Sequence, residues 1–330
     1  MVASLSIIVP LYNKTAFVRD MLQSLVPQLQ AHDEILIVDD CSSDGSYEVI
    51  RDLIADNVRY HRLIVNSGPA TARNRGAQLS GGQFLLFFDA DDIAHPQMLQ
   101  TVRAAIEAHP RQQLFTFGIG FQVGGDQALA LRQHRIMAAP KCTLLAQDAF
   151  VEAAIAGRTL CTASSTCVSR GAFETEHGFV EGLRFCEDPE LWARLSAKYP
   201  IVVIEELLAI YRHVPSSLSH GMRAIPGSVQ KYVDTLLGLA ATRGESYRAL
   251  ARSLVRKNTI FSRAAQVDRA AVIGYLRSTA PLFGHFECAT LRLVVWLPSG
   301  IWRGLLGFHA SLLRRRTSTR LGAGRGREVH

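Results

Sequence analysis

The 330-residue chain is 48% hydrophobic and 20% charged, which excludes a long disordered protein and allows one large domain with appendages or two smaller domains. Residues 1–220 contain 18 Lys and Arg against 24 Asp and Glu, whereas residues 221–330 contain 18 against 5. The net charge of +7 therefore hides a basic C-terminal third, which we expect to meet an anionic partner, either acidic lipid or nucleic acid.

Four short apolar runs in the first hundred residues predict buried strands, and each run ends at polar residues. They are Ser4–Val9, Ile35–Val38, Arg59–Val65 and Phe84–Phe88. Helical patterns lie between them, at Lys14–Leu29, Ser43–Ala55 and Pro69–Leu79. This order predicts an α/β fold with a doubly wound, mostly parallel sheet, in which ligands bind beyond the carboxyl ends of the strands.

The pattern is mixed after residue 110 and helical after Pro226. Strands are predicted at Leu114–Val123, Ala128–Met137 and Ile201–Tyr211, and a helix at Pro189–Lys198. The residues from Pro226 onward are rich in Arg, Ala and Leu and predict a C-terminal helical extension. The Arg- and Gly-rich residues from Thr317 predict a disordered tail.

The acidic stretch after the fourth predicted strand is the sharpest chemical signal. Asp89, Asp91 and Asp92 place three carboxylates within four residues, where they repel one another. A divalent cation relieves this repulsion, and Mn²⁺ or Mg²⁺ is commonly held by one or two carboxylates together with substrate phosphates. The alternative is the acidic N-terminus of a helix that follows Pro96.

Four sequence blocks stand in order at the ends of the predicted strands. They are SIIVPLYN from Ser6, IVDDCSSD from Ile37, NSGPATARNRG from Asn66 and FDADD from Phe88. Together they resemble the family 2 glycosyltransferases of the GT-A fold. CEDPELWAR from Cys186 and YRHVPSSLS from Tyr211 extend the resemblance to about residue 220.

The resemblance implies that residues 1–110 form the nucleotide-sugar-binding half of a GT-A domain, with a donor that we expect to be a UDP-sugar. Pro10, Tyr12 and Asn13 would line the nucleotide pocket. Asp39 and Asp40 would accept hydrogen bonds from a uracil-type base or the ribose. Asp40 also suits a cap of the following helix, and this second role is compatible with the first.

The resemblance also implies how the diphosphate, the sugar and the metal are held. Arg73 would face the nucleotide or the diphosphate, although it could also be a solvated helix residue. Asp89 and Asp91 would lie at the sugar diphosphate and the metal, with Asp91 the better metal ligand.

Residues 111–220 would form the acceptor-binding half of the domain. Asp188 would be the general base and Glu187 would support it, although Asp188 could also cap the helix that begins near Pro189. One base opposite the leaving group gives a single displacement with inversion at the sugar. Family members often place a histidine where this chain has Val214, so a metal contact from the neighbouring His213 is in doubt.

Two other functions compete with sugar transfer. A nucleotidyltransferase would need a glycine-rich loop after the first strand, which the residues Pro10–Lys14 lack. A non-catalytic nucleotide-sugar-binding relative would have no need for Asp188 and Asp91.

The C-terminal residues divide into a basic helical extension at 221–316 and the tail at 317–330. The span 293–313 is apolar but interrupted by Arg303 and His309, so we expect it to lie on a membrane surface, with Trp296 and Trp302 near the headgroups. The alternative is an amphipathic helix that covers the catalytic domain or a second copy. We expect no nucleic-acid binding, because the arginines lack interleaved aromatic residues.

The location of the protein is predicted from its cysteines and its N-terminus. The six cysteines form no CxxC pair, which is typical of reduced thiols, and no signal-peptide pattern opens the chain. These features, together with the basic extension, predict a cytoplasmic protein that is peripheral on the inner face of the cell membrane and that acts on a glycan or lipid-linked acceptor.

Overall fold

The computed structural model of the protein describes residues 3–122, 136, 140–183, 185–212 and 225–296. Its contacts divide the chain into two compact units. The first comprises Met1–Leu218 and Lys231–Ala251, and the second Ser219–Gln230 and Arg252–His330. The first unit begins and ends close to the predicted GT-A halves, but it also includes most of helix α9 (Gln230–Arg243) and the start of α10 (Glu245–Ala264).

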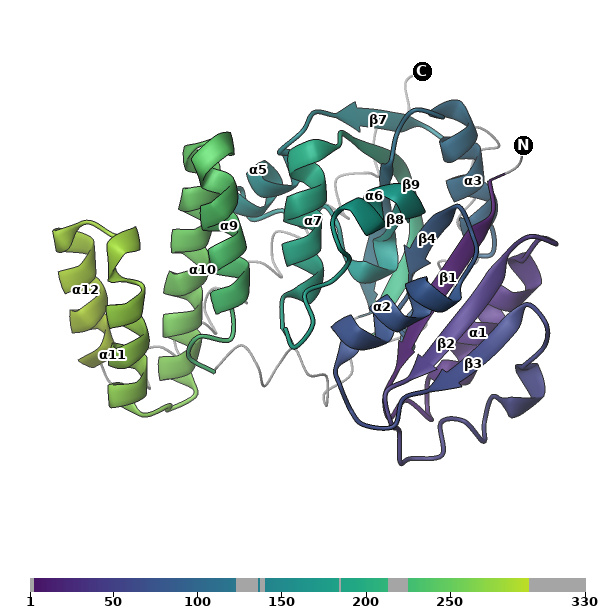
Figure 1. The fold of residues 1–330 in the computed structure, drawn as a ribbon, viewed down its shortest axis with the longest axis horizontal. Helices are drawn as coiled ribbons and strands as arrows, with labels where there is room; N and C mark the ends of the chain where they lie inside the picture. Colours follow the sequence, from purple (N-terminus) through teal and green to yellow (C-terminus); the bar gives the residue numbers. More distant parts are fainter. Residues whose placement is uncertain (1–2, 123–135, 137–139, 184, 213–224, 297–330) are drawn as a thin grey trace, which may run out of the picture. The chain divides into compact units, whose positions relative to one another are not determined.

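The N-terminal part of the first unit is a parallel sheet with the order β3-β2-β1-β4 (Figure 1). The strands are β1 (Leu5–Leu11), β2 (Glu34–Asp39), β3 (Val58–Arg62) and β4 (Phe84–Phe87). All four predicted strands are therefore confirmed, each within a few residues. Their carboxyl ends lie on one edge of the sheet, where the predicted site residues follow them.

The second part of the sheet is mixed. β8 (Thr166–Ser169) runs antiparallel between β4 and β6 (Leu114–Gln122), and β9 (Ile201–Arg212) is parallel to β6. Two short strands, β5 (Ile93–Ala94) and β7 (Cys142–Leu145), pair antiparallel with β9. The strands predicted near Leu114 and Ile201 are confirmed, and the one predicted at Ala128–Met137 lies outside the described residues except for Ile136.

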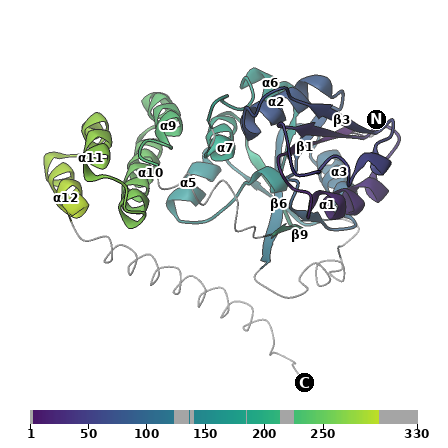
Figure 2. The same ribbon diagram turned by 90° about the horizontal axis from the view of Figure 1, so that it is seen from below.

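Helices cover both faces of the parallel strands (Figure 2). On one face, α1 (Val18–Leu25) and α3 (Met98–Ala108) share a core with Leu5, Ile7, Val9 and Leu11, which are alternate residues of β1. On the opposite face lies α2 (Pro69–Leu79), which packs on β1 and β2. The helices predicted around Lys14–Leu29 and at Pro69–Leu79 are therefore confirmed.

The helix predicted at Ser43–Ala55 is wrong. These residues form turns and a single 3-10 turn, η2 (Arg51–Leu53). Asp44 accepts backbone hydrogen bonds from Thr15 at 2.9 Å and from Ser46 at 3.0 Å. Ser46 Oγ accepts another from the Lys14 N–H at 2.9 Å. Such side-chain bonds to backbone compete with helix formation, and here they attach the segment to the loop after β1.

Helices α5 (Ala149–Ile155), α6 (Arg170–Thr175) and α7 (Glu187–Lys198) belong to the second half of the first unit. The helix predicted at Pro189–Lys198 is confirmed as α7. Phe87 of β4 packs on Phe179 and Phe173 with ring centroids 4.9 and 5.4 Å apart, and Phe179 packs on Trp192 of α7. This aromatic cluster fixes α7 against the central strand of the sheet.

The second unit contains the rest of α10, α11 (Arg269–Ser278) and α12 (His285–Trp296). Asn258 of α10 donates to the Ile225 carbonyl at 3.0 Å and accepts from the Gly227 N–H at 3.0 Å. The predicted helical character after Pro226 is confirmed up to Trp296. Among the helices that the structure describes, none has the length and apolar character needed to cross a bilayer.

Candidate active site

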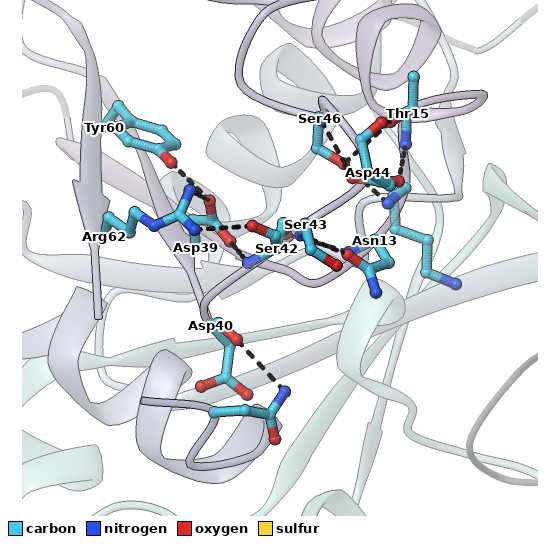
Figure 3. Close-up of polar contacts among 12 residues, drawn as sticks. Asn13, Thr15, Asp39, Asp40, Ser42, Ser43, Asp44, Ser46, Tyr60 and Arg62 are labelled. Carbon is cyan, nitrogen blue, oxygen red and sulfur yellow. Dashed lines mark hydrogen bonds and ion pairs between the residues drawn. The ribbon is translucent and has the colours of Figure 1, made fainter. Parts of the chain in front are cut away.

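The loop after β1 and the loop after β2 are joined by hydrogen bonds at the carboxyl edge of the sheet (Figure 3). Asn13 has a left-handed backbone with φ 50°, its N–H donates to Ser42 Oγ at 3.0 Å, and its Oδ1 accepts from the Ser43 N–H at 2.9 Å. Tyr12, beside Asn13, keeps 40% of its surface exposed. Pro10, also predicted to line the nucleotide pocket, is half-buried near the end of β1.

Asp39 is completely buried at the end of β2. Its Oδ1 accepts from the Ser42 N–H at 2.7 Å, and its Oδ2 accepts from the Tyr60 hydroxyl at 2.5 Å. Arg62 Nη1 lies 3.4 Å from the same Oδ2. Burial and the neighbouring Asp39 carboxylate raise the pKa of Tyr60, so the tyrosine stays a donor. Both oxygens of Asp39 are thus engaged within the protein.

Asp40 holds the beginning of α2. Its two carboxylate oxygens accept from the backbone N–H groups of Ser67, at 2.6 Å, and Gly68, at 2.7 Å. Gly68 precedes the helix with φ 92°, a conformation that favours glycine. The helix that Asp40 was predicted to cap, Ser43–Ala55, does not form, so Asp40 instead holds the residues that precede α2. Contact of Asp40 with a base or ribose stays a prediction.

Arg73 of α2 connects the donor-side carboxylates to helix α7. It is 4% exposed, and its guanidinium donates to Asp89 Oδ1 at 2.7 Å and to Glu187 Oε1 at 2.8 Å. Burial acts to lower the pKa of Arg73, but Asp89, Glu187 and Asp188 outweigh it and raise the pKa. Arg73 therefore faces carboxylates, rather than lying in solvent.

The acidic stretch after β4 has cationic partners that the sequence had not indicated. Asp91 forms an ion pair with Lys14, and the Arg212 guanidinium donates to the Asp91 carbonyl. Burial, followed by the neighbouring Asp89, raises the pKa of Asp91. Asp92 is fully buried, and its Oδ2 has no hydrogen-bond partner within the described ranges. Negative charge in this loop is therefore only partly balanced.

Glu187 and Asp188 occupy the first turn of α7, after Cys186 with a left-handed φ of 65°. Burial, and then the charge of Glu187, raise the pKa of Asp188 to about 7, although Arg73 opposes the rise. Farther along the helix, Glu190 accepts from Arg194 at 2.8 Å and from Thr235 of α9 at 2.7 Å. These bonds hold the helix that carries the predicted base.

Sequence reasoning missed Lys14 and Arg212 as partners of the acidic stretch, and Arg62 as a partner of Asp39. Lys14 could have been found from its position directly after Asn13 at a strand end, together with the need for cations near three aspartates. Arg62 closes β3 and was hidden in a strand prediction that extended to Val65. His213 lies outside the described residues, so its predicted metal contact stays a prediction.

The described side chains alone do not complete the predicted metal site. Across the ranges that the structure describes, no three His, Cys, Asp or Glu side chains are grouped so that they could hold a metal ion. Asp91 nevertheless fits a site of the kind in which one carboxylate and substrate phosphates share the ion, because it follows β4 beside Asp89 and Asp92 and has a single ion pair, to Lys14, among the described residues.

Comparison with known proteins agrees with this architecture. The family model described as Glycosyl transferase family 2 matches residues 6–155. The uncharacterized glycosyltransferase YibD of Escherichia coli (strain K12) is 39% identical over 100 residues, which are 30% of this chain and 29% of YibD. The chain matches between 29% and 64% of the length of this and three further curated relatives.

Two solved structures have the same fold. Residues 1–349 of S. aureus TarS in complex with UDP-GlcNAc superpose with a TM-score of 0.66 at 18% identity, over 87% of this chain and 83% of that chain. The mannosyltransferase PcManGT from Pyrobaculum calidifontis, in complex with GDP-Man and Mn²⁺, superposes with a TM-score of 0.53 at 18% identity. The superposition covers 97% of this chain and 84% of that chain.

The order of the strands and the two superpositions therefore show the GT-A fold. Residues 6–155 match the model of the family that the sequence blocks resemble, glycosyl transferase family 2.

Proposed function

We propose that this protein is an inverting glycosyltransferase that moves a sugar from a nucleoside diphosphate, with uridine the expected nucleoside, to an acceptor hydroxyl. The observation that carries the proposal is the Arg73 bridge, in which one buried guanidinium binds both Asp89 and Glu187. The bridge joins the loop expected to hold the donor to the helix turn that carries Asp188. Donor and acceptor chemistry therefore meet within one hydrogen-bonded cluster.

In this proposal, Asp188 removes the proton from the attacking hydroxyl. A carboxyl with a pKa of about 7 is well matched to this task, because at neutral pH it is partly ionised and still basic enough to take a proton. Glu187 stays fixed by Arg73 and raises the pKa of Asp188 by its charge. The hydroxyl oxygen attacks the anomeric carbon as the bond to the diphosphate breaks, and attack opposite the leaving group inverts that carbon.

Asp91 would hold Mn²⁺ or Mg²⁺ together with the donor diphosphate, and the ion would supply charge stabilisation for the departing diphosphate. Lys14 is already paired with Asp91 and would lie next to the phosphates. Asp89, held in place by Arg73, would accept hydrogen bonds from the sugar. Tyr12 and Asn13 would flank the nucleotide at the joined loops.

We also propose that the acceptor is a cell-surface or lipid-linked glycan and that the protein binds the cytoplasmic face of the membrane. The basic charge of residues 221–330 supports this location. Leu293 and Trp296 of α12 support it as well, because 71% and 60% of their surfaces are exposed.

The test is hydrolysis and binding of a panel of nucleotide sugars with Mn²⁺, Mg²⁺ or EDTA, in the wild type, Asp91→Asn and Asp188→Asn. We expect metal-dependent release of one nucleoside diphosphate. Asp91→Asn should lose metal-dependent donor binding. Asp188→Asn should bind the donor normally but lower turnover by about 10²–10⁴-fold, because only proton removal is lost.

Asp52→Asn is the matched control, because Asp52 is an exposed carboxylate paired with Arg19 and far from the acidic loop in the sequence. It should retain binding and turnover. If no nucleotide or nucleotide sugar binds the wild type in a metal-dependent way, the proposal is wrong. If the donor binds but Asp188→Asn turns it over at the wild-type rate, the assignment of the base is wrong.

A further inference from the structure

Asp39, one of the two aspartates expected to bind the base or the ribose, is covered in the structure. Asp39 has no exposed surface, and its two oxygens accept from Ser42 and Tyr60. A base could reach this carboxylate only after Tyr60 and Arg62 had moved away from it. In the closed network seen here, Asp39 therefore does not contact a base itself.

Arg62 lies between Asp39 and the solvent. Its Nη1 is 3.4 Å from Asp39 Oδ2, its Nη2 donates to the Ser42 carbonyl at 2.7 Å, and its side chain is still 49% exposed. Figure 3 shows the guanidinium directed at Asp39 and Ser42 from the end of β3. A guanidinium carries five N–H donors in a rigid fork. The contacts to Asp39 and Ser42, with further ones to Tyr60 and Cys41, fix its plane, and the exposed part of the side chain can still meet a ligand.

Ser42 connects Arg62 to the residues expected to flank the nucleotide. Its carbonyl accepts from Arg62, and its hydroxyl accepts from the Asn13 N–H at 3.0 Å. Tyr12, the residue before Asn13, presents an aromatic ring that is 40% exposed, and such rings stack on bases. Ser42 thus joins Arg62 to the loop that carries the exposed ring of Tyr12.

We infer that Arg62 is a specificity-determining residue that reads the nucleotide base by donating hydrogen bonds to a keto base, uracil or guanine. This inference rests on the proposed function, because it assumes a nucleotide donor at this edge. A guanidinium only donates, so it suits the O4 of uracil or the O6 and N7 of guanine. Cytosine and adenine carry an amino donor in the corresponding position, which would face the guanidinium donors unpaired.

The test measures the affinity for UDP, GDP, CDP, ADP and inorganic diphosphate, all with Mn²⁺, by titration calorimetry. Wild type should bind UDP or GDP at least about tenfold more tightly than CDP and ADP, and the UDP and GDP arms identify which keto base is used. Arg62→Ala should weaken binding of the preferred nucleotide by about tenfold or more, which removes the preference among bases. The affinity for inorganic diphosphate should stay unchanged.

Two further variants make the result decisive. Arg59→Ala is the matched control, because Arg59 lies on the same strand, is 45% exposed and pairs with Glu34 at 2.9 Å; it should keep the preference. Arg62→Lys keeps the charge and loses the fork, so it should also lose the preference, and it decides the matter if Arg62→Ala does not fold.

The outcomes separate this inference from the proposed function. An unchanged base preference in both Arg62 variants, an equal loss for all nucleotides and diphosphate, or a wild type that prefers CDP or ADP would overturn the inference while donor binding stands. Absence of metal-dependent binding of every nucleotide and of diphosphate to the wild type would overturn both.

Discussion

At the scale of single residues, the charge balance around Arg73 decides what the site can do. One buried cation faces Asp89, Glu187 and Asp188, so the three carboxylates cannot all be neutralised. Asp89 and Glu187 each receive an N–H from the guanidinium, whereas Asp188 feels only its field. Burial, followed by the charge of Glu187, raises the pKa of Asp188, and Asp188 is the carboxyl that we expect to exchange a proton with a substrate.

This balance predicts how turnover depends on pH. Because the pKa of Asp188 is raised to about 7, the carboxyl is protonated below pH 7 and cannot accept a proton. Turnover should therefore rise about tenfold per pH unit up to about pH 7 and level off above it. Glu187→Gln removes the neighbouring charge, so it should move this midpoint to lower pH. The measurement is the pH profile of donor turnover at saturating substrate. A midpoint that stays near 7 in Glu187→Gln would show that the charge of Glu187 does not contribute to the raised pKa of Asp188.

The sequence identified the acidic residues of this site but not their partners. Asp39, Asp89 and Asp188 could be found because strand ends and a family motif mark them along the chain. Lys14 and Arg62 could not, because their importance depends on which side chain lies opposite after folding. Lys14 is 77 residues from Asp91, and no local pattern carries information about such a pair.

At the scale of elements, the closeness of α2 to the sheet sets the position of Arg73. Gly76 lies in the interior of α2, where glycine costs about 0.5–1 kcal/mol relative to alanine. The structure gives the reason: a Cβ at this position would overlap Ile8 Cγ2 and lie 3.3 Å from Val38 Cγ2. Ile8 is β-branched and in the sheet, so it has little freedom to move away.

We therefore predict that Gly76→Ala destabilises the protein despite its better helix propensity. The overlap should lower the free energy of unfolding by about 1–3 kcal/mol. The measurement is urea unfolding, followed by a signal from the first unit. Turnover should fall as well, because Arg73 lies one turn earlier on the helix that is pushed outward. Gly238→Ala in α9 is the control: no atom lies within 4 Å of its added Cβ, so it should stabilise slightly. Equal stability changes in the two variants would exclude the close-approach explanation.

The sequence predicted the elements that carry a pattern of their own better than those that depend on neighbouring strands. β1 to β4 and α2 were visible because apolar runs and a Gly-Pro helix start mark them directly. β5, β7 and β8 have two to four residues each, and they are strands only because β9, β4 and β6 lie beside them. The Ser43–Ala55 helix was wrong because Asp44 and Ser46 bind the β1 loop, a partner that only the fold supplies.

At the scale of the whole molecule, charge separates the two parts of the sequence. The acidic first part carries the carboxylates of the proposed site, and the second unit is basic. Within that unit, Arg269, Arg277 and Arg292 are exposed on α11 and α12, and the Arg269 guanidinium lies 5.1 Å from the Trp296 ring centroid. An exposed tryptophan next to arginines is typical of a surface that meets lipid headgroups.

We predict that the full chain sediments with vesicles containing phosphatidylserine and not with neutral vesicles, and that salt weakens the binding. Each arginine near such a surface contributes about 1 kcal/mol, so Arg277→Ala with Arg292→Ala should weaken binding about 30-fold. Trp296→Ala with Leu293→Ala should weaken it at high salt as well, because their contribution is apolar. Arg19→Ala, an exposed arginine of the first unit, should bind vesicles like the wild type. Retention on nucleic acid without vesicle binding would instead show that the basic part of the chain serves an RNA or DNA partner.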